Sequence, residues 1–90
     1  MSPIRREQFR TLILLACLGA GEFGVVREAL IVGLRAGGFR QDADDQLNDE
    51  LAYLVDKNFL SLKAKAISPE NRQWKITADG RDFLAEGGLA

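Results

Sequence analysis

The fold is decided by two runs of alternating residues and the turn between them: Asn58-Phe59-Leu60-Ser61-Leu62-Lys63-Ala64-Lys65, then Ser68-Pro69-Glu70-Asn71, then Arg72-Gln73-Trp74-Lys75-Ile76-Thr77. In the first run, Leu60 and Leu62 point to one side of a strand and Lys63 to the other. In the second run, Trp74 falls on one side and Lys75 on the opposite one. Proline and asparagine between the runs are typical of a turn. The pattern predicts an antiparallel hairpin, with strands over residues 59–66 and 72–77, that has one apolar face and one lysine-bearing face.

A two-stranded hairpin is only marginally stable alone, so its apolar face has to pack against helices. Apolar spacing and capping residues predict helices over residues 3–18, 26–36, 43–57 and 78–86. Ser2, Asp42 and Thr77 are the expected N-caps of the first, third and fourth helices, and Asn58 the expected C-cap of the third. The pair Val25-Val26 either forms a short strand beside the hairpin or begins the second helix.

The first helix is polar at its start and apolar on nearly every side from Leu12 to Leu18. A helix of this kind needs two partners, which are its own core and either the surrounding helices or a second subunit. Both interpretations stay open, and the second predicts a homodimer through helix one. Cys17, within the apolar run, is expected to be a small core residue.

The 90 residues are expected to form a single domain, 1–90, of α+β class, mainly α, in the order helix, helix, helix, strand, strand, helix. The run Leu51-Ala52-Tyr53-Leu54-Val55-Asp56-Lys57-Asn58-Phe59-Leu60 and the later Trp74-Lys75-Ile76-Thr77-Ala78-Asp79-Gly80 resemble winged helix-turn-helix DNA-binding domains. From Arg6 to Gly87 the chain is also similar to small winged-helix proteins of Mu-like phages and prophages. The resemblance implies a DNA-binding, transcription-regulator-like protein of phage or prophage origin.

In a helix-turn-helix, the start of the second helix of the motif enters the major groove. The candidate DNA-contacting residues combine that helix, its approach and the hairpin: Arg40, Gln46, Asn48, Lys63, Lys65, Arg72 and Lys75. Lysines on the hairpin could bind phosphates, although lysines also protect exposed strand edges from aggregation.

The charge of the third helix favours a different partner. Five acidic residues lie between Asp42 and Glu50, and no basic residue follows before Lys57. Carboxylates facing DNA phosphates add repulsion and release no counterions. Asp44, Asp45 and Asp49 are therefore the candidate contact residues of the alternative hypothesis, a winged-helix module that binds a basic protein partner and not DNA.

Catalysis is not expected, because the chain has no histidine and one cysteine and shows no phosphate-binding glycine motif. No cofactor and no metal site are expected either. The net charge of −1 and the pI of 5.3 predict no bulk attraction to nucleic acid or to an anionic membrane. The apolar run of helix one is too short to span a bilayer and lacks the features of a signal peptide, which predicts a cytoplasmic protein.

Overall fold

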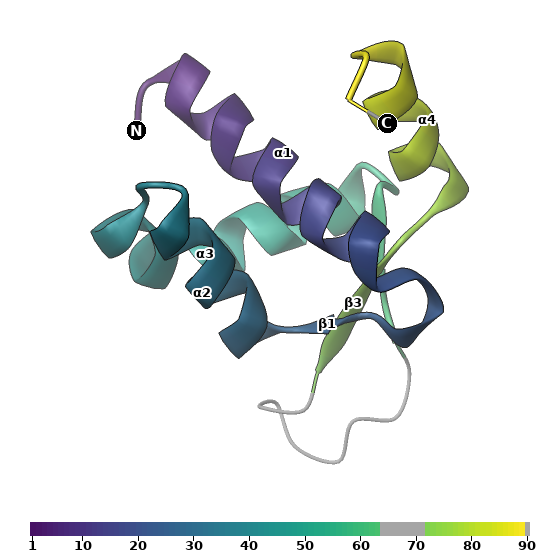
Figure 1. Ribbon diagram of the computed structural model, residues 1–90, viewed down its shortest axis with the longest axis horizontal. Coiled ribbons are helices and arrows are strands. Elements are labelled where there is room, and N and C mark those ends of the chain that lie inside the picture. Colours follow the sequence, from purple (N-terminus) through teal and green to yellow (C-terminus); the bar gives the residue numbers. More distant parts are fainter. Residues whose placement is uncertain (64–71, 90) are drawn as a thin grey trace.

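The computed structural model describes residues 1–63 and 72–89 (Figure 1). These residues form a mainly helical α+β structure, with four α-helices, one short 3-10 helix and a three-stranded antiparallel sheet. The helices are α1 (Pro3–Ala20), η1 (Gly21–Phe23), α2 (Arg27–Ala36), α3 (Arg40–Asp56) and α4 (Ala78–Glu86). The strands are β1 (Val25–Val26), β2 (Leu60–Leu62) and β3 (Gln73–Ile76).

The sheet is built around β3, which pairs with β2 on one side and β1 on the other. Trp74 is the central residue, because it lies opposite both Val25 and Leu62 in the register of the two pairs. The question left open for Val25-Val26 is thus answered: the pair is a strand, and α2 starts directly after it. Both strands of the predicted hairpin are present: β3 is one residue shorter at each end than predicted, and β2 begins one residue later than predicted, while residues 64–66 of the predicted first strand lie outside the described residues. The predicted turn Ser68–Asn71 and the candidate residue Lys65 lie outside the described residues.

Two of the predicted helix caps are confirmed. The Ser2 Oγ accepts a hydrogen bond from the Arg5 amide at 3.2 Å, and the Thr77 Oγ1 accepts one from the Gly80 amide at 3.0 Å. Helix α1 runs two residues beyond the predicted end at residue 18, through Gly19, and stops where Gly21 takes a positive φ of 60°.

The predicted start of the third helix at Ala43, with Asp42 as its cap, is wrong. The helix begins at Arg40, and Phe39 occupies the N-cap position without a capping side-chain bond. Phe39 is buried, and its ring meets that of Phe9 edge to face, with 5.2 Å between the centroids. Burial of this aromatic ring, rather than capping by a carboxylate, decides where the helix begins.

The end of α3 is a Schellman turn. Lys57 is the C-cap, so the predicted cap Asn58 lies one residue further on, where it takes the left-handed conformation with φ 64°. The Phe59 amide then donates to the Leu54 carbonyl at 3.0 Å and the Asn58 amide to the Val55 carbonyl at 2.9 Å. This turn leads the chain directly from α3 into β2.

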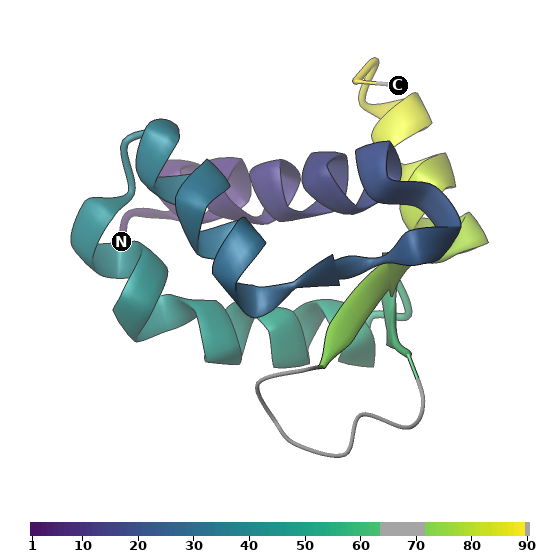
Figure 2. The same ribbon diagram turned by 60° about the horizontal axis from the view of Figure 1, so that its bottom comes forward.

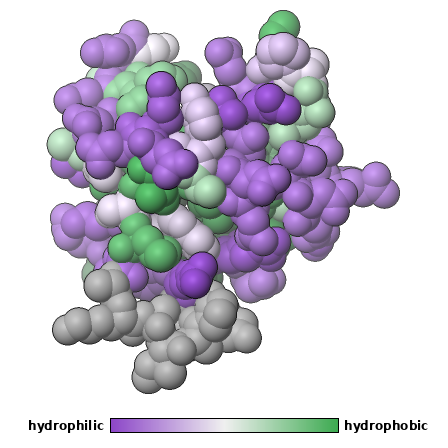
Figure 3. Space-filling view, turned by 180° about the vertical axis from the view of Figure 1, so that it is seen from behind, coloured by the Kyte–Doolittle hydropathy of each residue, from purple (hydrophilic) through white to green (hydrophobic). Residues whose placement is uncertain are grey.

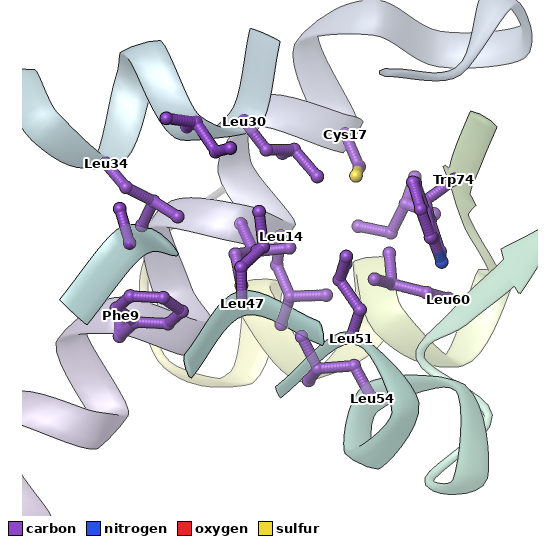
Figure 4. Packing of buried hydrophobic residues seen from close by; sticks show 14 of the residues in the cluster. Phe9, Leu14, Cys17, Leu30, Leu34, Leu47, Leu51, Leu54, Leu60 and Trp74 are labelled. Carbon is purple, nitrogen blue, oxygen red and sulfur yellow. The ribbon is translucent and has the colours of Figure 1, made fainter. Parts of the chain in front are cut away.

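The hydrophobic core lies between α1, α2, α3 and the inner face of the sheet (Figure 4). Ile13, Leu14 and Cys17 of α1 are fully buried, so the apolar half of this helix packs into the protein's own core. Figure 2 shows α1 and α3 running across the molecule on opposite sides of it, with the sheet near one end of both. Within the described residues, no helix is both long and apolar enough to cross a membrane.

Candidate interaction surfaces

A groove of about 640 Å³ lies between α3 and the inner face of the sheet, and we call it the α3–sheet groove. Its apolar walls are formed by Leu51, Ala52 and Val55 of α3 and by Leu62 and Trp74 of the sheet. Leu51 and Trp74 belong to the core, whereas Val55 is 36% and Leu62 44% exposed. Figure 3 shows hydrophobic surface directly beside the grey segment, within a face that is otherwise mostly hydrophilic.

The rim of the α3–sheet groove carries charges of both signs. Arg27 and Glu28 stand at the start of α2, and Asp56 stands at the end of α3. Arg72, just before β3, completes the rim and is exposed. Of the predicted DNA-contacting residues within the described chain, Arg72 and Asn48 are the two that reach this groove.

Arginines of α2 hold two of the polar residues predicted to contact a partner. The Arg27 Nε donates to the Asn48 Oδ1 at 3.0 Å, and its Nη2 donates to the Asp44 carbonyl at 3.4 Å. The Arg35 Nη2 donates to the Asp44 Oδ2 at 2.6 Å. Asn48 and Asp44 are thereby tied to the neighbouring helix, which reduces what each can offer to a ligand.

Three other acidic residues of α3, Asp45, Asp49 and Asp56, form a stripe beside the groove. Asp45 and Asp49 are exposed, and with Ala52 and Asp56 they follow the i, i+4, i+7, i+11 spacing of one helix face. Ala52 and Asp56 also line the α3–sheet groove. The acidic stripe therefore runs straight into the apolar surface.

Two further predicted DNA-contacting residues on α3 do not join this surface. Gln46 is half-buried, and Arg40 is exposed at the first residue of α3. Neither lines the α3–sheet groove, whose α3 residues begin at Asn48.

Two of the predicted hairpin lysines fall within the described residues, and both lie on the outer face of the sheet. Lys63 and Lys75 alternate with the groove-facing Leu62 and Trp74, so they point to the opposite side. The Lys75 Nζ lies 2.7 Å from the Glu22 Oε2, and the Lys63 Nζ donates to the Phe23 carbonyl at 3.4 Å. The two lysines thus converge on η1 and do not meet Asn48 or Arg72 at the groove.

Sequence reasoning missed the groove itself. Leu62 lies on the predicted apolar face of the hairpin and Val55 falls at core spacing in α3, but the structure leaves both side chains partly exposed. A signal was present in the sequence, because α3 carries three leucines, Leu47, Leu51 and Leu54, that suffice for its core stripe. Val55 then widens the apolar face beyond what the core covers.

A second groove of about 620 Å³, the α1–α4 groove, lies on the other flank of α3. Its aromatic lining consists of Tyr53, Phe59 and Phe83. The rings of Phe59 and Phe83 stack with their centroids 4.8 Å apart, and the Arg10 guanidinium lies 3.7 Å from the centroid of Tyr53. Arg10 also pairs with the buried carboxylate of Glu50, which the Arg6 Nε approaches to 3.6 Å.

The Cys17 thiol is inaccessible to solvent. Cys17 is buried, and desolvation raises the pKa of its thiol to about 12, so it stays protonated near neutral pH. Across residues 1–63 and 72–89, no three or more His, Cys, Asp or Glu side chains are grouped so that they could hold a metal ion.

Comparison of the chain with protein-family models, with curated proteins and with solved structures gave no match.

Proposed function

We propose that this chain is a winged-helix module that docks a protein partner through α3 and the α3–sheet groove. The winged-helix assignment is supported by the order of the elements. The turn at Gly37-Gly38 joins α2 to α3, the β2–β3 hairpin follows α3, and β1 adds to the far edge of β3. In a helix-turn-helix this arrangement presents α3 outward.

The observation that carries the proposal is the exposed apolar surface of the groove. Val55 of α3 and Leu62 of β2 both line the groove and are partly exposed, and Ala52 and Trp74 line it with them. A surface that binds a duplex needs donors and cations for phosphates and base edges. A concave apolar surface with a charged rim is instead what a protein-binding site offers.

The charge distribution supports the same proposal. Asp45 and Asp49 are exposed on the face of α3 that would approach the ligand, where each would repel a phosphate. Lys63 and Lys75, which would have to compensate, lie across the sheet and contact η1. Approach of DNA to α3 would therefore bring carboxylates, not lysines, to the backbone.

The partner is a segment whose chemistry complements this surface. Apolar side chains on one of its faces would fill the groove over Val55 and Leu62. Lysine or arginine residues along the adjoining flank would pair with Asp45, Asp49 and Asp56. A basic amphipathic helix has both features, since its charged and apolar stripes run side by side.

A photo-crosslinking amino acid at position 52 in the full chain, expressed in its native cells, tests this proposal. We expect a protein adduct at position 52 that is lost when Asp45 and Asp49 are both changed to asparagine. The matched control is the same crosslinker at Val32, which is 68% exposed on α2 and lines neither groove. Adducts to DNA alone, or equal protein adducts at both positions, would contradict the proposal.

DNA binding is the second candidate, favoured by the helix-turn-helix order and by exposed Arg72 at the groove rim. It would use the hairpin, including Lys65, to contact phosphates. Binding of the purified protein to random duplex DNA at about 50 mM and about 200 mM salt tests it, because phosphate contacts weaken steeply over that range. Salt-sensitive binding that is abolished by Lys63→Glu with Lys65→Glu would establish DNA as the ligand and overturn the protein-docking proposal.

A further inference from the structure

The α1–α4 groove gathers exposed apolar side chains that the protein's own fold leaves uncovered. Phe83 is 44%, Tyr53 38% and Leu89 48% exposed, and all three line the groove around half-buried Phe59. Aromatic residues in such numbers are typical of the centre of a protein interface.

The walls of this groove carry opposite charges on different helices. Lys57 caps the end of α3, and Glu86 is the last residue of α4. Glu7 adds a second carboxylate from α1, while Arg10 is engaged by Glu50 and Tyr53. Among residues 1–63 and 72–89, Lys57 forms no ion pair, so the patch presents a cation on one wall and carboxylates on the others.

We infer that this groove is the contact surface of a homodimer and that its occupant is a second copy of the chain. A two-fold axis places the same patch on both subunits, so the patch must complement itself. The α1–α4 groove meets this condition, because the aromatic centre would pack on its own copy. Lys57 of one copy would then face Glu86 of the other, twice in each dimer.

The proposed dimer contact lies on a different surface from the apolar half of helix one. One of the two open interpretations of the sequence is a homodimer through the apolar half of helix one, but Ile13, Leu14 and Cys17 are fully buried in the protein's own core. In the proposed dimer, α1 supplies polar rim residues such as Glu7, and α4 with the end of α3 supplies the apolar contact. No described residue lines both this groove and the α3–sheet groove, so the dimer inference does not rest on the proposed function.

Sedimentation equilibrium of the full chain across about 1–100 μM protein tests the inference, because this range covers dissociation constants in the micromolar range. We expect the mass to rise with concentration from the monomer value of 9.9 kDa toward twice that value. Lys57→Glu and Glu86→Lys should each raise the dissociation constant about fivefold, as expected for the loss of a rim charge pair. The double variant should recover the wild-type value.

Phe83→Ser tests the aromatic centre and should raise the dissociation constant at least about tenfold. Its circular dichroism spectrum must match that of the wild type, and Tyr53→Ser provides an independent change at the same centre. Val32→Asp, on exposed α2 surface, is the control and should leave the mass unchanged. A wild-type mass of 9.9 kDa at every concentration, or a dimer that survives both serine variants, overturns the inference. If the double charge variant does not regain the wild-type dissociation constant, the pairing of Lys57 with Glu86 across the two-fold axis is overturned.

Discussion

Arg27, the first residue of α2, donates a hydrogen bond from its Nε to the Oδ1 of Asn48 at 3.0 Å. Asn48 belongs to the face of α3 that a helix-turn-helix would use to read bases. The contact therefore joins α2 to α3 through a side chain that the sequence predicts to contact DNA. Because Arg27 also reaches the Asp44 carbonyl, one side chain fixes two successive turns of α3.

Changing Arg27 to alanine should lower the free energy of unfolding by about 1 kcal/mol, the usual net value of one side-chain hydrogen bond with some ion pairing. Urea denaturation measures this loss. Gln41→Ala, at an exposed position near the start of α3, is the control and should stay within about 0.5 kcal/mol of the wild type. Equal destabilisation by both changes would contradict a specific role for Arg27.

Glu50→Ala should destabilise the protein by about 2 kcal/mol or more. Glu50 is 5% exposed and pairs with Arg10 and Arg6, so its loss removes the carboxylate that links α1 to α3. Loss of one partner from a fully buried pair costs more than this, but Arg10 and Arg6 keep access to water. Denaturant unfolding measures this change in the free energy of unfolding. The control is Asp49→Ala at the exposed neighbouring position, which should change stability by no more than about 0.5 kcal/mol. A small effect of Glu50→Ala, equal to that of the control, would show that the pair contributes no net stability.

Two glycine-to-alanine changes should have opposite effects on the free energy of unfolding. A Cβ at Gly80 would clash with the Phe59 carbonyl oxygen and lie 2.8 Å from the Ile76 Cγ1, so Gly80→Ala should lower the free energy of unfolding by about 2 kcal/mol or more. A Cβ at Gly33, inside α2, meets nothing within 4 Å, so Gly33→Ala should stabilise by about 0.5–1 kcal/mol. Thermal unfolding of both variants measures the two changes in stability. A Gly80→Ala protein as stable as the wild type would disprove the close contact of α4 with the chain at Phe59.

The contact between Glu22 and Lys75 should be visible in a titration. A hydrogen bond from Lys75, and then its charge, lower the pKa of Glu22 below the ordinary value of 4.5. Because the folded pKa is the lower one, the stabilising contribution is present above pH 4.5 and is lost as the pH falls below 4.5 through the folded value. NMR titration of the Glu22 carboxyl should show the low pKa in the wild type and a return toward 4.5 in Lys75→Met. Added salt should have the same effect as the mutation, since both groups are near solvent; an unchanged pKa in Lys75→Met would refute the contact.

Local signals in the sequence were enough to predict the hairpin and two helix caps. Alternation placed Trp74 on the apolar face of its strand, and Ser2 and Thr77 cap helices as their side chains predict. The start of α3 was predicted wrongly because capping by Asp42 is a local signal, and a long-range contact outweighs it. That contact is the packing of buried Phe39 against Phe9, 30 positions away in the chain.

The candidate surface was harder to predict than the fold. Alternation correctly placed Lys63 and Lys75 on one face, but the sequence does not show that η1 lies beside that face to receive them. The pairing of Arg27 with Asn48 likewise depends on how α2 crosses α3. Partial exposure of Val55 depends on how far the sheet covers α3, which periodicity does not specify.

The two grooves share one wall, because Ala52 lines the first and the adjacent Tyr53 lines the second. If α3 rotated about its own axis, both side chains would move together, and one groove would widen as the other narrowed. A ligand that favours one orientation of the helix would therefore change the affinity of the opposite groove. By thermodynamic linkage, occupancy of that second groove would change the affinity of the first by the same factor.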